Sequence, residues 1–266
     1  MMKRSKILIN INNLSEIEEY KKIGINNFLF AIEEFSIGYK TFPLTEVPDD
    51  SYIYLNRVMD TASIDNFKKI VPELKRFKGI IFEDIGIFHI LKNEGLNLIW
   101  FQNHFTTNKA SLSYYINHGC LSAVISNEIT AKEIEEIIGE LPGKLVLNVL
   151  GKNNIMYSRR TLLSNFNKYQ NLDEYNDMTL NTGKNSFFAR ESEYGTLIFN
   201  NEYFNYIPYA NKLNEDDLYL YLILNLDLNV SKIDEIINGE EFGNIGFLNK
   251  KTVYKMSEYD DKKVVS

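Results

Sequence analysis

The chain has 266 residues, of which 44% are hydrophobic and 24% are charged. This composition is sufficient to bury a large core and excludes an intrinsically disordered chain. Asp and Glu number 36 against 29 Lys and Arg, so the net charge is −7. Binding to nucleic acid through phosphate contacts needs positive charge, so the sequence shows no strong nucleic-acid footprint.

The chain contains one cysteine, Cys120, which excludes an intramolecular disulfide and a metal site built from several cysteines of one chain. Basic residues at the N-terminus precede a short apolar run broken by Asn, which predicts a first strand rather than a signal peptide. The longest apolar stretches are too short to span a membrane. We therefore expect a cytoplasmic protein without membrane segments, and the abundance of Asn, Ile, Lys and Tyr indicates a bacterial one.

Eight short apolar runs, rich in Ile, Val, Leu, Phe and Tyr, predict buried strands. They cover residues 6–12, 26–32, 52–56, 79–84, 97–102, 122–128, 144–150 and 217–224. Amphipathic segments lie between them; capping-box patterns at Ser15 and Thr130 predict helix starts, as does Ser63. Alternating strands and helices predict parallel pairing through right-handed crossovers. Eight strands of this kind predict an α/β fold, a TIM-like (β/α)8 barrel, as a single domain over residues 1–266.

One stretch, residues 169–206, interrupts the alternation between the seventh and eighth strands. Polar sequence is followed there by a period-two pattern, which predicts a β-hairpin insertion. Its aromatic side chains either cap the barrel, which we favour, or pack against a partner. They are Phe187, Phe188, Tyr194, Phe199, Tyr203 and Phe204. Residues 257–266 are expected to form a disordered tail.

Polar side chains follow most of the predicted strands, at the end that faces the site in a β/α barrel. They are Glu33, Glu34, Asn56, Glu83, Asp84, Gln102, Asn103, Asn127 and Glu128. These amides and carboxylates could bind a polar small molecule, and Asp84, Glu83 and Glu128 could hold a divalent cation. The alternative is that they cap helices or face solvent. His104 is the only histidine expected near them, and no HExxH, GxSxG, GxGxxG or P-loop pattern is present.

The segment after the seventh predicted strand is the densest candidate, with Tyr157, Ser158, Arg159 and Arg160 in succession. We expect a loop after Gly151, in a region of β/α barrels that commonly binds anions. Two guanidinium groups can hold a carboxylate or a phosphate. A salt-bridged, helix-capping segment is an equally favoured interpretation.

This segment reads L-G-K-N-N-I-M-Y-S-R-R-T-L-L-S from Leu150 to Ser164. It resembles the signature of peptidase family U32, the collagenase-like peptidases, in which His-Gly and Cys precede Tyr-Ser-Gly-Arg-Cys-Leu-Leu-Ser. The matching residues are Gly151, Tyr157, Ser158, Arg160, Leu162, Leu163 and Ser164. Blocks at residues 102–119, 124–137 and 192–204 are also similar to the family.

The chain departs from the family at the positions that carry its chemistry. The family His falls on Leu150, the two signature cysteines fall on Asn154 and Thr161, and an Arg of the sixth strand falls on Asn127. In relatives, including proteins for tRNA, rRNA and ubiquinone hydroxylation, the cysteines are associated with an iron–sulfur cluster. Asn and Thr are poor iron ligands, so we expect no cluster and no other cofactor, although a divalent cation is possible.

Two functions therefore stay open. The first is a cluster-free enzyme, a peptidase or a protein related to RNA modification, with a polar or anionic ligand in the barrel mouth. The second is a non-catalytic partner subunit of a cluster-bearing relative. No catalytic residue is assigned. The candidate ligand-binding residues are Glu34, Asn56, Asp84, Gln102, Asn108, Glu128, Tyr157, Ser158 and Arg160.

Overall fold

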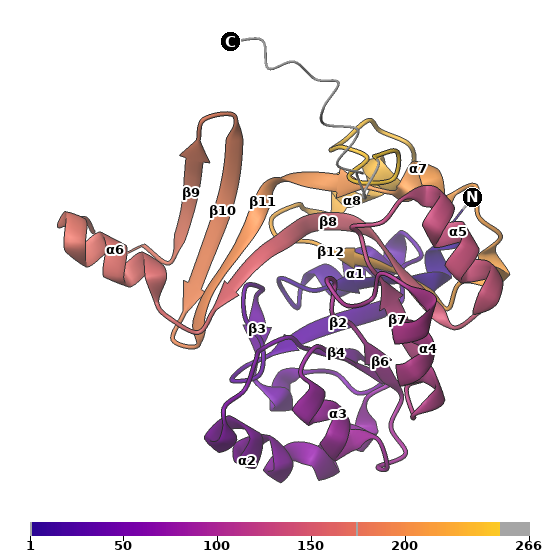
Figure 1. Cartoon of the computed structure of the whole chain (residues 1–266), viewed down its shortest axis with the longest axis horizontal. Helices are drawn as coiled ribbons and strands as arrows, with labels where there is room; N and C mark the ends of the chain where they lie inside the picture. Colours follow the sequence, from indigo (N-terminus) through magenta and orange to yellow (C-terminus); the bar gives the residue numbers. More distant parts are fainter. Residues whose placement is uncertain (1, 174, 251–266) are drawn as a thin grey trace, which may run out of the picture.

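The computed structural model of the chain describes residues 2–173 and 175–250, so the predicted tail at 257–266 lies outside the described residues. Eight parallel strands form a closed barrel in the order β1, β2, β4, β5, β6, β7, β8 and β12, with β12 pairing with both β8 and β1 (Figure 1). Their bounds are β1 (Ile7–Asn10), β2 (Asn27–Ile32), β4 (Tyr52–Leu55), β5 (Gly79–Phe82), β6 (Leu98–Trp100), β7 (Ser122–Ile125), β8 (Leu145–Ser158) and β12 (Leu220–Leu224). The predicted barrel and all eight predicted strands are confirmed.

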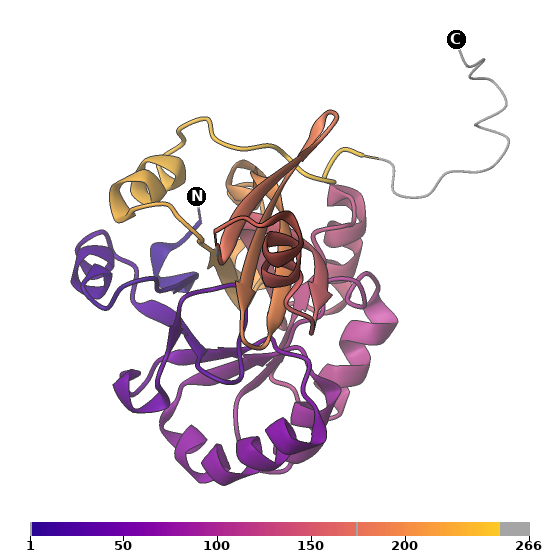
Figure 2. The ribbon, with the colours of Figure 1, turned by 90° about the vertical axis from the view of Figure 1, so that its left-hand side faces the viewer.

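Helices surround the barrel, as Figure 2 shows. They are α1 (Glu16–Lys22), α2 (Thr61–Ile70), α3 (Ile85–Leu91), α4 (Lys109–Asn117), α5 (Ala131–Glu140), α7 (Ile207–Ala210) and α8 (Val230–Ile237). Short 3-10 helices cover Arg4–Lys6, Leu44–Glu46, Val71–Arg76 and Glu215–Asp217. A short strand, β3 (Thr41–Phe42), pairs with β2. The capping box predicted at Thr130 is present. Helix α1 starts after Ser15 as predicted, but the Ser15 side chain makes no cap hydrogen bond. The prediction at Ser63 is wrong, because Asp60 caps α2 by accepting from the Ser63 N–H.

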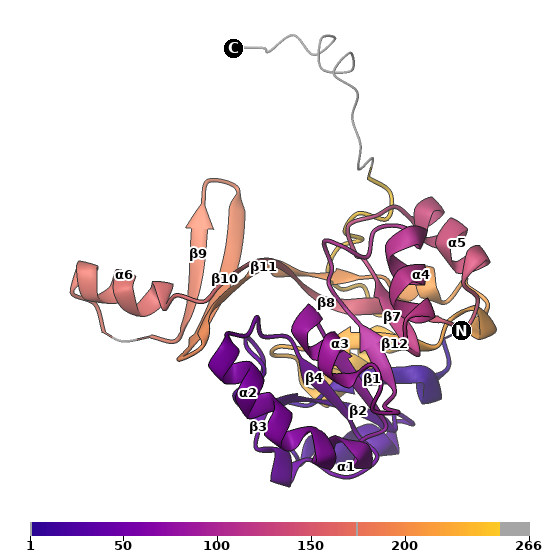
Figure 3. The same ribbon diagram turned by 60° about the horizontal axis from the view of Figure 1, so that its bottom comes forward.

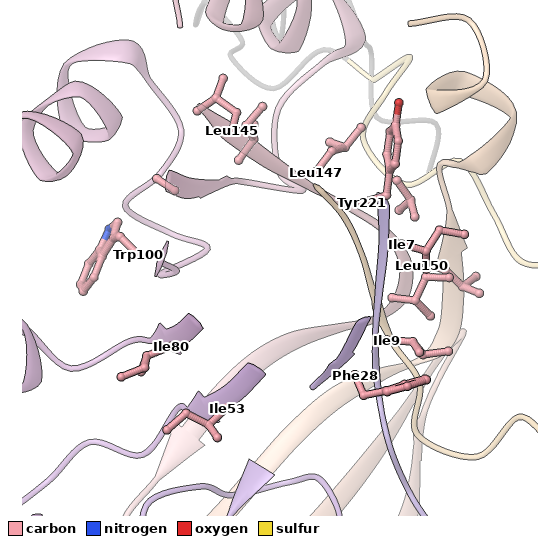
Figure 4. Packing of buried hydrophobic residues seen from close by; sticks show 14 of the residues in the cluster. Ile7, Ile9, Phe28, Ile53, Ile80, Trp100, Leu145, Leu147, Leu150 and Tyr221 are labelled. Carbon is pink, nitrogen blue, oxygen red and sulfur yellow. The ribbon is translucent and has the colours of Figure 1, made fainter. Parts of the chain in front are cut away.

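The alternation of side chains along the strands separates two apolar clusters. One fills the barrel interior and includes Leu8, Leu29, Ile81, Ile99, Val124, Val146 and Leu222. The other lies between the strands and the helices and includes the residues labelled in Figure 4, Ile7, Ile9, Phe28, Ile53, Ile80, Trp100, Leu145, Leu147, Leu150 and Tyr221. Because the interior is packed, a site can form only at an end of the barrel.

Strand β8 continues past the barrel as the first strand of an antiparallel extension (Figure 3). It pairs with β11 (Gly195–Asn205), which pairs with β10 (Asn185–Ser192), which pairs with β9 (Asp177–Thr182). We call residues 152–205 the arm; it also contains α6 (Leu162–Gln170). The predicted hairpin corresponds to β10 and β11. The predicted loop after Gly151 is wrong, because β11 supplies hydrogen-bonding partners that keep the chain extended to Ser158.

The base of the arm closes the barrel mouth. Leu197 and Phe199 of β11 join the interior cluster, and the Phe199 ring meets the Tyr39 ring edge-on at 5.8 Å between centroids. The Arg57 guanidinium lies 4.1 Å from the centroid of the Tyr194 ring. Of the insertion's aromatic residues, Phe199 and Phe188 thus pack on the barrel interior, whereas Tyr203 and Phe204 belong to the outer cluster.

Candidate functional site

A polar pocket lies at the mouth of the barrel, where the parallel strands end. We call it the mouth pocket; its lining residues are Tyr39, Tyr54, Asn56, Glu83, Phe101, Gln102, Asn103, His104, Asn127, Asn148, Lys152, Asn153, Asn154, Leu197 and Leu224. Its free volume is about 30 Å³, which admits water-sized groups and would have to widen for a larger ligand. Because the carboxyl ends of all the parallel strands lie at this end of the barrel, side chains that are distant in sequence meet here.

Glu83 and Tyr54 are the central titratable pair of the pocket. The Tyr54 hydroxyl group donates a hydrogen bond to Glu83 Oε1. Burial raises the pKa of Glu83 to about 8, although the hydrogen bond from Tyr54 opposes the shift. Burial and the neighbouring Glu83 charge also raise the pKa of Tyr54 well above its usual value. Glu83 is therefore mostly protonated at neutral pH and can donate a proton.

Buried asparagines hold the strand ends in place. Asn56 accepts from the Ile37 N–H at 2.8 Å and donates to the Ile37 carbonyl at 3.0 Å, and Asn127 Nδ2 donates to the Asn148 carbonyl at 3.0 Å. Within the described part of the chain, Oδ1 of Asn148 and Oδ1 of Asn154 are buried without a hydrogen-bond partner. Leaving such an acceptor unpaired costs free energy, so the pocket favours a ligand that brings N–H or O–H donors.

His104 lies at the rim of the pocket beside Glu128. Its Nδ1 is 3.2 Å from Glu128 Oε1, and Asn103 Nδ2 donates to the same oxygen at 3.3 Å. The Asn103 side chain also accepts from the Asn127 N–H at 2.9 Å, which fixes it between two strand ends. When His104 carries its proton on Nδ1, Glu128 orients the ring and Nε2 is a free base.

Lys152 is a site residue that sequence reasoning missed. Its side chain is 6% exposed, and Nζ lies 3.3 Å from both Asp227 Oδ2 and Asn201 Oδ1. The preceding Gly151 allows β8 to approach β12, because a Cβ there would lie 3.1 Å from the Leu224 carbonyl oxygen. A Gly-Lys pair directly after an apolar strand was the only sequence signal for it.

The structure brings some of the predicted residues together. Asn56 and Gln102 line the mouth pocket, and Glu128 holds the rim histidine. Asp84 and Asn108 instead are N-terminal caps, of α3 and α4 respectively, where their side chains accept from Gly86 N at 2.6 Å and Ser111 N at 3.1 Å.

The other predicted residues lie around the arm. The Tyr157 hydroxyl donates to the Tyr194 carbonyl at 3.2 Å, and Ser158 Oγ accepts from the Arg160 N–H at 3.1 Å. Arg160 is exposed, whereas its neighbour Arg159 pairs with Asp60 at 2.7 Å. Glu34 is exposed and has a positive φ of 66°. The two-arginine anion site therefore is not assembled here, since one guanidinium is already paired.

The donor set does not suit an iron–sulfur cluster. Among residues 2–173 and 175–250, no group of three or more His, Cys, Asp or Glu side chains is placed to hold a metal ion. A cluster needs several thiolates, but the chain has one cysteine, and burial raises the pKa of the Cys120 thiol to about 12. Cys120 also precedes β7, at the end of the barrel opposite the mouth. The position of the family histidine, Leu150, faces the outer apolar cluster (Figure 4).

Comparisons with known proteins bear on this geometry. The sequence model of peptidase family U32 matches residues 10–221. A solved structure described as the U32 peptidase Mk0906 is 8% identical, covers 86% of this chain and 94% of its own, and has a TM-score of 0.52, which shows a shared fold. No curated protein sequence matches the chain. Over the described residues, no helix is both long enough and apolar enough to cross a membrane.

Proposed function

Because the chain belongs to peptidase family U32, we propose that its mouth pocket binds a peptide and hydrolyses a peptide bond, with Glu83 as the proton donor. The observation that carries the proposal is the Glu83 carboxyl group, whose pKa burial raises to about 8 in a polar pocket at the barrel mouth. A buried carboxyl with a strongly raised pKa is typical of an acid–base catalyst.

Hydrolysis requires a base that takes a proton from water and an acid that protonates the departing amine. His104 lines the pocket with Nδ1 directed at Glu128, so its Nε2 is the candidate base. The hydroxide adds to the carbonyl carbon, the C–N bond breaks, and the nitrogen takes the proton of Glu83. The unpaired Oδ1 atoms of Asn148 and Asn154 would accept hydrogen bonds from peptide N–H groups.

The test is cleavage of a mixed peptide library, followed by mass spectrometry, with the wild type, Glu83→Gln and the matched surface variant Glu73→Gln. Removing a general acid should lower kcat by a factor of about 100 or more. Glu73 is exposed in the turn after α2, so its variant should cleave as the wild type does. If Glu83→Gln cleaves peptides as fast as the wild type does, Glu83 is not the proton donor. If the wild type cleaves no peptide, the proposed peptidase function is wrong.

A second candidate function is that of a non-catalytic partner subunit of a cluster-bearing relative. The observation that favours it is a group of exposed apolar side chains at the far end of the arm: Phe166, Tyr169, Leu172 and Tyr175, with Tyr169 82% exposed. Such groups commonly mark protein interfaces. Affinity purification from the native host should then recover a U32 relative, and Phe166→Ser with Tyr169→Ser should abolish its recovery. Recovery of no relative by the wild type argues against this function.

A further inference from the structure

A second polar pocket lies on the arm, outside the mouth pocket. It is enclosed by the turn between β9 and β10, by β11 and by the segment that follows α8, and its volume is about 520 Å³. We call it the outer cleft. Five asparagines and the two lysines Lys184 and Lys250 line it, against a single acidic residue, Glu202. Its volume falls within the range of small-ligand sites, unlike that of the mouth pocket.

The wall formed by the segment after α8 is fixed to the arm. The Asn244 N–H donates to the Tyr203 carbonyl at 2.9 Å, and the Asn205 N–H donates to the Asn244 carbonyl at 2.7 Å. Gly243 allows this approach, because it has φ +65° and a Cβ there would lie 2.5 Å from the Tyr203 carbonyl oxygen. These contacts fix this wall of the cleft to β11.

The outer cleft adjoins the mouth pocket. Asn153 of β8 lines both. The two are also joined by the Tyr206 hydroxyl, which donates to the carbonyl of Asn127 at 2.9 Å and accepts from the N–H of Phe247 at 3.1 Å. Asn127 lines the mouth pocket and Phe247 lines the cleft. The two pockets are therefore neighbours, and an extended ligand can span them once the mouth pocket widens beyond its free volume of about 30 Å³.

The amides and lysines that line the outer cleft favour a ligand with a peptide backbone and negative charge. A carboxamide both donates and accepts hydrogen bonds, as each peptide unit of an extended chain requires. The Glu202 carboxylate keeps its charge and accepts a hydrogen bond from Asn244 Nδ2 at 2.8 Å, but the two lysines outnumber it, so the lining carries a net positive charge. Within the described part of the chain, no carboxylate forms a salt bridge with Lys184 or Lys250. The cleft thus offers two cations to a ligand in a protein with a net charge of −7.

We propose that the outer cleft binds the acidic segment of a peptide whose neighbouring residues enter the mouth pocket. The carboxylates lie between Lys184 and Lys250, and the side chains of Asn153, Asn185 and Asn200 bind the backbone, since those of Asn201 and Asn244 already hydrogen-bond within the protein. This inference rests on the proposed peptide-binding function and names its substrate class: peptides that carry Asp or Glu beside the bond in the mouth.

The test measures binding by fluorescence anisotropy at low ionic strength, separately from cleavage. One probe is a fluorescein-labelled Gly-Ser-Glu-Asp-Glu peptide, and the other is its Gly-Ser-Gln-Asn-Gln counterpart. The variant is Lys184→Glu with Lys250→Glu. Its control is Lys22→Glu with Lys75→Glu, which makes the same change of net charge at exposed sites outside the cleft. We expect the cleft variant alone to weaken binding of the acidic peptide by a factor of about ten and to leave the amide peptide unaffected.

The two proposals fail separately. Equal affinity for the two peptides, no binding of either, or an equal effect of the two lysine pairs would overturn the assignment of the cleft. Charge-dependent binding without cleavage would uphold the cleft and remove only the peptidase function. Cleavage that depends on Glu83 but is unchanged by the lysine substitutions in the cleft would support the peptidase function and overturn the assignment of the cleft.

Discussion

The Tyr54 hydroxyl group donates a hydrogen bond to Glu83 Oε1 across two adjacent strands of the barrel, β4 and β5. The two side chains lie in the mouth pocket, where burial raises the pKa of both groups. The folded protein therefore binds the proton of Glu83 more tightly than the unfolded chain does. The stability of the barrel therefore depends on the protonation of Glu83.

The first prediction concerns the pH dependence of stability. The pKa of Glu83 rises from 4.5 to about 8 on folding, so its contribution is complete below pH 4.5 and is lost as the pH rises through 8. Between pH 5 and pH 9 the wild type should lose on the order of 4 kcal/mol more unfolding free energy than Glu83→Gln, which stays neutral. Urea unfolding at several pH values measures this difference. Parallel curves for the two proteins would show that the pKa of Glu83 is not raised.

The second prediction concerns the turn that joins β10 to β11. Gly195 has φ +131°, and a Cβ there would lie 2.1 Å from the Ser158 carbonyl oxygen. Gly195→Ala should therefore separate β11 from β8 and expose the backbone amides of the arm to solvent. We expect the free energy of unfolding to fall by about 2 kcal/mol or more. Gly183→Ala is the control, since Gly183 also has a positive φ, +58°, but has no atom within 4 Å of its Cβ position. Hydrogen exchange should rise in residues 152–205 only in the Gly195 variant, and equal exchange in the two variants would contradict the clash.

The strands could be predicted because parallel strands buried on both faces appear as continuous apolar runs. The extension of β8 to Ser158 could not, because its partner, β11, begins only at Gly195 and the pairing leaves no local pattern. From the sequence alone, residues of the site are harder to distinguish from residues that cap helices. Asn56 and Asp84 both follow strands, but Asn56 lines the mouth while Asp84 caps a helix. The end of a strand is also the start of the next helix, so the same polar residue types suit both positions.

The third prediction concerns the ion pair between Lys152 and Asp227. The Lys152 side chain is 6% exposed and that of Asp227 is 57% exposed. Removing one partner should therefore change the free energy of unfolding by a different amount from removing the other. Asp227→Asn leaves a buried cation with a weaker partner and should cost about 1–2 kcal/mol, which allows for solvent screening. Lys152→Met keeps the apolar stem and leaves a solvated carboxylate, so it should cost less. Urea unfolding measures both values, and the reverse order would mean that burial of Lys152 contributes little.

The fourth prediction concerns Glu191, which fixes the start of α6 to the arm. Its carboxylate accepts from Leu163 N at 2.7 Å, Ser164 N at 2.9 Å and Thr196 Oγ1 at 2.6 Å. Burial raises the pKa of Glu191, but the hydrogen bonds from Ser164, Thr196 and the backbone outweigh it and hold the pKa below the usual value. The stabilisation is therefore present above pH 4.5 and is lost as the pH falls through the lowered pKa.

Glu191→Gln should accordingly loosen α6 at neutral pH by about 1–3 kcal/mol, because an amide offers one acceptor oxygen where the carboxylate offers two. Its exposed neighbour Glu193 gives the control, Glu193→Gln, which should leave α6 unchanged. Hydrogen exchange of residues 162–170 should be faster in the Glu191 variant at pH 7, and the difference from the wild type should shrink toward pH 3. A difference that stays constant with pH would mean that packing, and not the charged carboxylate, holds α6 in place.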